Sequence, residues 1–286
     1  MHVAAVDREV RVIEPRQPGV LERFVEAWRY RSLVRFFGRR FIEKLYLRTW
    51  LGWLWIPLRP IADLGSRVFV FGGLLGVGVA GVPYLLYVLV GMSAWELFDR
   101  TAYWATRSLE LNRRFLRRIY IPRLTLLAGA IFPSLLNYGI YFLLTLIAVG
   151  CYAIADGELY LEFGVDSLLV PAGLTLLVLL ALSIGLWLSV YGAQARDVRF
   201  GLSYALTFWF FVTPIVIPLS QIPDGYRPIV EINPVTGPMQ MVKRGLFGGE
   251  PVPTLALVST VVAIALIGGL GTWFFSRSES AALDSL

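Results

Sequence analysis

The sequence LLVPAGLTLLVLLALSIGLWLSVY, residues 168–191, contains no charged side chain over its whole length. A helix needs about 20 predominantly apolar residues to cross the hydrocarbon core of a bilayer, so this stretch predicts a membrane-spanning helix. The 286-residue chain has the same bias, because 57% of its residues are hydrophobic and only 16% are charged. Soluble domains carry about 25% charged residues. The composition therefore predicts an all-α integral membrane protein.

On either side of residues 168–191, five further apolar stretches are long enough to be spans. The six predicted spans lie near residues 52–78, 84–104, 124–155, 168–191, 201–219 and 253–275. They divide the chain into an N-terminal segment (1–51), a transmembrane domain (52–276) and a short tail (277–286). Residues 20–50 of the first segment are amphipathic, basic and aromatic, which favours a helix in the membrane interface. A soluble helix packed on a partner is the alternative.

The positions of Lys and Arg predict the orientation of the spans. Residues 1–51 carry eleven of them and residues 105–123 carry six, whereas the loops on the opposite side carry three. The positive-inside rule therefore places both termini in the cytoplasm, and the N-terminal segment lacks a cleavable signal pattern. The net charge of +6 follows from this asymmetry. We expect a multi-pass protein of the cytoplasmic (inner) membrane that contacts membrane lipids and no nucleic acid.

Few residues are suited to catalysis. The chain has one histidine, His2, and one cysteine, Cys151, which argues against histidine-based chemistry and against a metal site. It contains no G-x-x-x-x-G-K-[ST] motif, so it has no phosphate-binding loop for ATP. We expect no catalytic residue, no metal and no cofactor in this chain.

Charged residues in the first two spans require an explanation. Arg59, Asp63 and Arg67 follow at intervals of four, so they share one helix face with Trp55. A charge at the centre of a lone helix costs roughly 2.5–3.5 kcal/mol, so these groups must face protein or water. The second span contributes a further set, namely Glu96, Asp99 and Arg100.

The two sets balance in charge, and we expect Arg59 to pair with Asp99 or Glu96. One interpretation is a structural network between the two helices. The other is a polar path on which arginines, whose guanidinium groups suit phosphate and sugar oxygens, contact a substrate.

Two polar segments lie outside the spans. Residues 107–123 carry Arg113, Arg114, Arg117 and Arg118 on one helix face, suited either to lipid headgroups or to docking on a cytoplasmic partner. Residues 214–253 are too polar and proline-rich to span, yet apolar enough to enter the bilayer from the outer side. We predict two re-entrant half-helices separated near Asn233–Pro234; an exterior loop with a surface helix is the alternative.

Four stretches in order identify a resemblance. They are LGWLWIPLRP (51–60), IYIPR (119–123), ARDVR (195–199) and TPIVIPLSQIPDGYRPIVEINPV (213–235). With the six spans, they resemble the permease subunits of ABC-2-type polysaccharide exporters from about residue 20 onward. The resemblance implies a homodimer that assembles with two copies of a cytoplasmic ABC ATPase, which would bind ATP and Mg. The implied cargo is a lipid-linked polysaccharide such as O-antigen.

The resemblance also implies roles for particular residues. Residues 107–119 would form the helix that couples to the ATPase, and residues 220–248 would form an outer gate. The residues implied for coupling are Arg113, Arg114, Arg117, Arg118, Tyr120 and Pro122. The residues implied for the gate are Pro214, Pro218, Pro223, Asn233 and Pro234.

The chain departs from the family at its intramembrane charges. Arg59 stands where the family often has glutamine, and Glu96, Asp99 and Arg100 stand in a span usually rich in Ser and Thr. No residue specifies a sugar, so an exporter of a small molecule or drug is an alternative. Proteins of other classes are also alternatives, namely a membrane-embedded transferase that uses a polyprenyl donor and a non-transporting scaffold.

Overall fold

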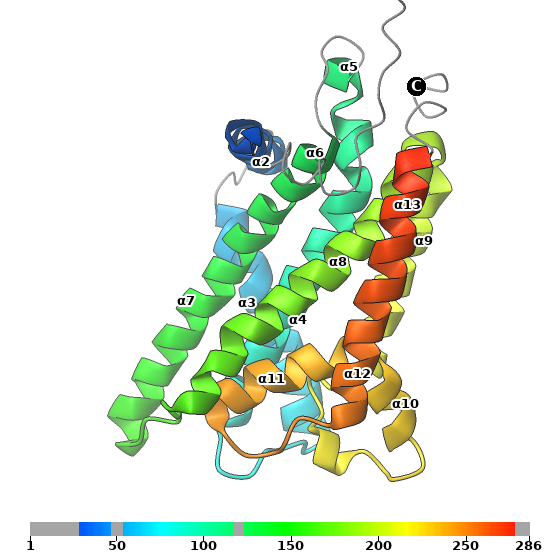
Figure 1. Cartoon of the computed structure of the whole chain (residues 1–286). Helices are drawn as coiled ribbons and strands as arrows, with labels where there is room; N and C mark the ends of the chain where they lie inside the picture. The colour runs from blue at the N-terminus through cyan, green and yellow to red at the C-terminus, as the bar shows by residue number, and fades with distance from the viewer. Residues whose placement is uncertain (1–28, 47–53, 117–122, 278–286) are drawn as a thin grey trace, which may run out of the picture.

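The computed structural model describes residues 29–46, 54–116 and 123–277, and within these ranges the chain forms helices and no strands. Long helices run side by side in one bundle, with α5 and α6 at one end and α10 and α11 at the other (Figure 1). The α-helices are α2 (Arg31–Tyr46), α3 (Trp55–Arg67), α4 (Tyr84–Leu111), α5 (Arg113–Leu116), α6 (Arg123–Gly129), α7 (Ile131–Asp156), α8 (Leu169–Gln194), α9 (Arg196–Val212), α10 (Arg227–Ile232), α11 (Thr236–Phe247), α12 (Thr254–Ala263) and α13 (Gly269–Arg277). Four short helical segments complete the set: η2 (Val68–Leu74), η3 (Val165–Leu168), η4 (Leu219–Gln221) and η5 (Ile264–Gly268).

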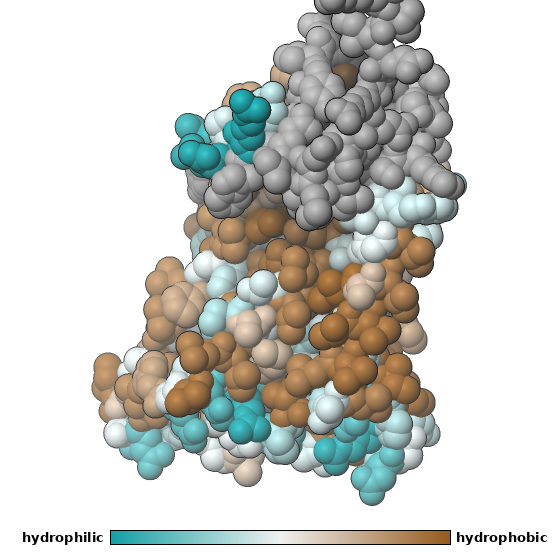
Figure 2. All heavy atoms as spheres, viewed as in Figure 1, coloured by the Kyte–Doolittle hydropathy of each residue, from teal (hydrophilic) through white to brown (hydrophobic). Residues whose placement is uncertain are grey.

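Three of the six predicted spans correspond to helices that are long and apolar enough to cross a membrane. These helices cover Leu124–Asp156, Val165–Gly192 and Thr254–Phe274. Their outward side chains are largely apolar, and Figure 2 shows an apolar belt above a more polar lower end. Apolar side chains that face outward are stable in lipid, which supports a multi-pass membrane protein.

The other three predicted spans are less regular. Residues 52–78 contain α3 and then the π-helical η2, and α9 has only 17 residues. The predicted second span lies within α4, which is 28 residues long but carries the charges noted above. Six spans therefore remain a prediction for this chain.

The third span is interrupted where its prolines and glycines allow it. Helix α6 ends at Gly129, and α7 begins at Ile131 after a single intervening residue. Pro133 lies in the first turn of α7, where a missing backbone N–H breaks no helical hydrogen bond. The interruption is confined to Ala130, and the segment runs on as helix from Leu124 to Asp156.

Helix α4 lies at the centre of the bundle and packs against α7 and α8. Leu86, Val88 and Phe98 of α4 and Leu177 and Leu180 of α8 are all fully buried. The two helices approach closely because α8 carries glycine at the contact, and a Cβ atom at Gly185 would collide with the methyl group of Ala105. Small residues are typical of such close helix contacts in membrane proteins.

The substitution Gly185→Ala is expected to destabilise the fold by about 1–3 kcal/mol, because overpacking forces α4 and α8 apart. Thermal unfolding of the purified protein in detergent measures this loss. Gly139→Ala in α7 is the matched control, since a Cβ atom there meets nothing within 4 Å. The control should be neutral or stabilise by up to about 1 kcal/mol, because alanine favours helix over glycine. Equal effects of the two changes would contradict the close contact.

Helix α2 is seen nearly end-on in Figure 1, so it crosses the ends of the long helices rather than joining them. Phe37 and Phe41 are buried on its inner face, with only 2% of each residue exposed. Phe36, on the neighbouring face, is exposed. The amphipathic pattern therefore covers one end of the bundle with an apolar face. The part of the predicted helix before residue 29 lies outside the described residues.

Candidate functional site

A cavity of about 620 Å³ opens between α3, α4 and α9. It brings together seven charged side chains from two helices: the six predicted ones, Arg59, Asp63, Arg67, Glu96, Asp99 and Arg100, and in addition Arg107 of α4. Helix periodicity predicted that each set shares a face, and the packing turns both faces toward the same space. Trp55, which was predicted to belong to this path, begins α3 and is not among the residues that line the cavity.

The charges pair within each helix rather than between helices. Arg59 Nε lies 4.0 Å from Asp63 Oδ2, and Arg100 Nε lies 3.0 Å from Glu96 Oε2. The prediction that Arg59 pairs with Asp99 or Glu96 is therefore wrong for the direct ion pair. Side chains four residues apart on one helix are neighbours on its surface, so this pairing does not depend on how the two helices pack.

The Glu96–Arg100 pair on α4 is largely buried. The Glu96 and Arg100 side chains are only 13% and 20% exposed. Asn137 Nδ2 of α7 also donates a hydrogen bond to Glu96 Oε2, at 2.7 Å. Glu96 thus accepts from two helices, and Arg100, Glu96 and Asn137 form a network that holds α4 against α7.

The charges on α3 are open to the cavity. The Arg59 and Asp63 side chains are 64% and 40% exposed. The guanidinium carbon of Arg67 lies 4.6 Å from the centre of the Phe210 ring of α9, a cation–π contact. A guanidinium group carries five N–H donors. Because the Arg59 side chain is 64% exposed, most of its donors face solvent and can bind an oxygen-rich ligand. The Glu96–Arg100 pair on α4 is therefore structural, whereas Arg59 and Asp63 on α3 are accessible.

Sequence reasoning missed part of the cavity wall. Aromatic and hydroxyl side chains of α4 and α9 complete it, including Trp95, Tyr103, Ser203, Thr207, Phe210 and Phe211. Ser203, Thr207 and Phe210 recur at intervals of four and three, the spacing of one helix face. This weak amphipathic signal in an apolar span was the available clue.

At the α5 end of the bundle, α5 contacts α2, and α4 is linked to α9. Arg113 begins α5, and Phe115 of α5 contacts Arg40 of α2, whose guanidinium carbon lies 4.4 Å from the ring centre. Glu110 accepts hydrogen bonds from Arg199 Nη1 of α9 at 2.6 and 2.7 Å, one to each carboxylate oxygen. The last arginine of ARDVR therefore connects the end of α4 to the start of α9.

The remaining residues implied for coupling are only partly described. Arg117, Arg118, Tyr120 and Pro122 lie outside the described residues, and so does the side chain of Arg114. Their roles stay predictions.

At the opposite end, two helices flank Asn233–Pro234, as the sequence predicted: α10 before it and α11 after it. The Asn233 side chain is a hydrogen-bond centre. Its Oδ1 accepts from Trp209 Nε1 at 2.8 Å and from the backbone N–H of Val235 at 3.1 Å, while its Nδ2 donates to Thr213 Oγ1 at 2.9 Å. The carbonyl of Pro234 accepts from Thr260 Oγ1 at 2.8 Å. The turn is thereby joined to α9 and α12.

The other three predicted gate residues, Pro214, Pro218 and Pro223, lie in the segment between α9 and α10. Pro214 follows α9, and its carbonyl accepts a hydrogen bond from Lys243 Nζ of α11 at 2.6 Å. The Ile215 carbonyl accepts a second bond from the same nitrogen at 3.0 Å. Pro218 precedes η4, and the Pro223 carbonyl accepts from the backbone N–H of Tyr226 at 2.9 Å. The five predicted gate residues thus lie in one region held by side-chain and backbone hydrogen bonds.

The apolar helices around a charged cavity define a multi-pass membrane protein with a polar interior. Residues 32–247 match the family described as ABC-2 type transporter. The chain belongs to this family, whose members are transporter permeases.

Named relatives cover nearly the whole chain. The O-antigen export system permease protein RfbA of Myxococcus xanthus is 25% identical over 264 residues, which is 90% of this chain and 96% of that protein. The polysialic acid transport protein KpsM of Escherichia coli is 26% identical over 253 residues, or 85% of this chain and 95% of that one. An O-antigen export permease RfbA of Klebsiella pneumoniae is 21% identical over 71% of this chain and 74% of its own.

Proposed function

We propose that this chain is the permease subunit of an ATP-driven exporter that moves a lipid-linked polysaccharide across the cytoplasmic membrane. The observation that carries the proposal is the cavity between α3, α4 and α9, which combines exposed arginine with aromatic rings. Relatives named for O-antigen export and polysialic acid transport support this class of cargo. The family is one of transporters, and the sequence has no phosphate-binding loop, so a separate ABC ATPase would bind ATP and Mg.

The accessible charges on α3 suit the lipid-diphosphate end of such a cargo. Arg59 and Arg67 present guanidinium groups that match phosphate oxygens in pairs, as a lipid diphosphate requires. Trp95 and Phe210 line the same cavity and offer ring faces to sugars. Asp63 accepts hydrogen bonds from hydroxyl groups. The cavity would thus hold both the charged and the neutral parts of a lipid-linked saccharide.

The proposed arrangement in the membrane follows the arginine distribution. Residues 52–276 would form the six-span transmembrane domain, with the α5 end and both termini in the cytoplasm and the segment 277–286 as a tail. Helix α2 would lie in the inner interface, and α10 and α11 would be re-entrant half-helices that close the exit. Two copies would assemble, supported by a row of exposed aromatic side chains on α9: Phe200, Tyr204, Phe208 and Phe211.

The ATPase would act on the segment around α5. Arg113 and the residues after it would dock on the ATPase, and Glu110 would pass the motion to α9 through Arg199. Because α9 lines the cavity, a shift of its first turn would change the width of the path.

The test separates the two sets of charges in cells that depend on this gene. Deleting the gene should leave lipid-linked polymer inside the cell. Arg59→Gln should assemble at normal levels with the ATPase and lower surface polymer roughly five- to tenfold, since one guanidinium contact is worth about 1–1.5 kcal/mol. Arg100→Gln should instead lower the melting temperature, because Glu96 loses its cation.

Normal export by a stably folded Arg59→Gln protein would contradict the path role of α3. If the protein exported a small molecule and the deletion strain retained no polymer, the cargo would be a small molecule and not a polysaccharide. Turnover of a polyprenyl-linked donor by the purified chain alone would identify a transferase.

A further inference from the structure

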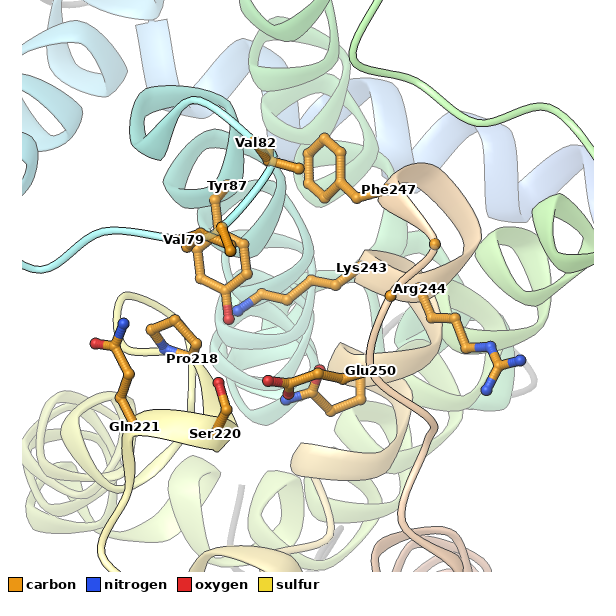
Figure 3. A pocket seen from close by; sticks show the side chains of 14 residues that line it. Val79, Val82, Tyr87, Pro218, Ser220, Gln221, Lys243, Arg244, Phe247 and Glu250 are labelled. Atoms are coloured by element: carbon orange, nitrogen blue, oxygen red, sulfur yellow. The ribbon is translucent and has the colours of Figure 1, made fainter.

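A second cavity, of about 510 Å³, lies at the other end of α4 from the α5 segment (Figure 3). It is enclosed by residues 79–82, the first turn of α4, residues 218–221, α11 and the loop 248–250. Along α4, Tyr87 of this cavity and Trp95 of the first are eight residues apart, which is about 12 Å of helix rise. The two cavities therefore occupy two levels of one helix, and this one is on the proposed outer side.

The two basic side chains that line the outer cavity, Lys243 and Arg244, already interact with other groups of the protein. Lys243 Nζ donates to the carbonyls of Pro214 and Ile215 and lies 3.7 Å from the centre of the Tyr87 ring. Arg244 Nε donates to Asp166 Oδ2 at 3.0 Å. In Figure 3 the Lys243 side chain extends to Tyr87, whereas Arg244 points away from it. Arg244 is thus charge-paired with Asp166, and the Lys243 ammonium is covered by the two carbonyls and Tyr87, with only 4% of the residue exposed.

Other polar groups of the cavity are available. Gln240 is only 4% exposed, and its Nε2 has no hydrogen-bond partner within the described part of the protein. Glu250 forms no ion pair or hydrogen bond with any described residue, and its carboxylate faces the same space as Ser220. Gln221 Nε2 donates to the Gly78 carbonyl at 2.6 Å, which orients the amide. A buried donor without a partner is uncommon in proteins, because it loses its hydrogen bond to water.

This combination suits a neutral, hydroxyl-rich ligand. Hydroxyl groups donate to a carboxylate such as Glu250 and accept from an amide such as Gln240 Nε2. The apolar face of a sugar ring can lie on Phe247, which belongs to the hydrophobic part of the wall. Glu250 is exposed, whereas Lys243 is buried, so the accessible carboxylate would repel an acidic sugar. The volume lies within the range of about 300–1,000 Å³ that is typical of small-molecule sites.

The chain connects the two cavities directly. Phe210 and Phe211 line the first cavity, and after a short link Pro218 lines the second. The link between them is held by Lys243, by Asn233 and by Tyr84, whose hydroxyl donates to the Val216 carbonyl at 3.1 Å. The two cavities are therefore lined by consecutive parts of one chain segment.

We propose that the outer cavity is a binding site for a neutral sugar unit, with Gln240 as the donor, Glu250 as the acceptor and Phe247 as the ring platform. The site rests on the proposed function, in which the cargo is a polysaccharide. It would hold one unit of the chain next to the gate, so that the polymer does not slip back between steps.

The test uses the purified full chain in lipid nanodiscs free of glycoside detergent. Saturation-transfer NMR with the methyl glycosides of glucose, mannose, galactose and N-acetylglucosamine, and with methyl glucuronide, measures binding. At least one neutral glycoside should bind, and the glucuronide should bind at least tenfold more weakly. Gln240→Leu and Glu250→Ala should each weaken the neutral glycoside at least tenfold, and Gln240→Leu should keep or raise the melting temperature. Glu158→Gln, an exposed outer-loop control, should change neither value.

Three outcomes overturn the proposal: no neutral glycoside binds, the glucuronide binds equally well, or binding survives both cavity substitutions. The deletion strain distinguishes this failure from failure of the proposed function. If polymer is retained in cells without the gene but no glycoside binds, only the outer site is wrong. If glycosides bind but no polymer is retained, the site stands and the cargo assignment is wrong.

Discussion

Replacing Lys243 by methionine should lower the free energy of unfolding by about 3–5 kcal/mol. Lys243 is 4% exposed and donates hydrogen bonds to two consecutive carbonyls just after α9. Methionine has a similar length but no donor, so both carbonyls lose their partner in a buried position. A buried group left unsatisfied costs about 1–3 kcal/mol, and the contact with Tyr87 is lost as well.

Thermal unfolding in detergent, followed by loss of monodisperse protein, measures the effect as a fall of roughly 6–12 °C for a chain of this size. Arg244→Met is the matched control, because it removes a cation from the next position of the same helix. Its partner Asp166 is 52% exposed, so the control should cost no more than about 1 kcal/mol. A Lys243→Met protein as stable as the original would show that the segment after α9 is held in another way.

Breaking the Glu110–Arg199 pair should cost about 2–4 kcal/mol and reduce coupling to the ATPase. The two side chains are 30% and 17% exposed, so the pair is partly shielded and removing one member leaves the other charge without its strongest partner. A fully buried pair costs about 3–5 kcal/mol to break, and solvent at this site lowers that value. Arg107 Nε, 3.5 Å from Glu110 Oε2, compensates part of the loss when Arg199 is removed.

A double-mutant cycle with Glu110→Gln and Arg199→Gln measures the pair itself. The double variant should lose less stability than the sum of the single variants, with a coupling energy of about 1–3 kcal/mol. ATP-dependent export should fall in all three variants if the pair transmits motion to α9. The exposed pair Arg39–Glu43, 84% and 50% exposed, is the control and should show a coupling below about 0.5 kcal/mol. Additive single effects at positions 110 and 199 would contradict the link.

Much of the fold was predictable because it depends on local sequence. The uncharged stretches at 124–155, 168–191 and 253–275 match three long apolar helices almost residue by residue. The break at Asn233–Pro234 was predictable for the same reason, since proline and asparagine interrupt helices locally. Ordered motifs also identified the transporter family that the comparisons show.

The candidate site was predictable only in part. Periodicity places Arg59, Asp63 and Arg67 on one face, and Glu96, Asp99 and Arg100 in the next span. It does not state how α3 and α4 are rotated about their axes, so the direct partner of Arg59 was wrongly predicted. The same limit hid α9, whose Thr207 and Phe210 complete the wall of the first cavity.

Sequence by itself determined the features that depend on neighbours within one or two helix turns. These are the apolar spans, the helix breaks, the charged faces and the distribution of arginine. Tertiary structure alone decided which charges are structural and which are accessible. Glu96 accepts a hydrogen bond from Asn137, 41 positions away, and Lys243 donates hydrogen bonds to carbonyls 28 and 29 positions away. Such contacts depend on the rotation and depth of packed helices, which no local pattern of residues specifies.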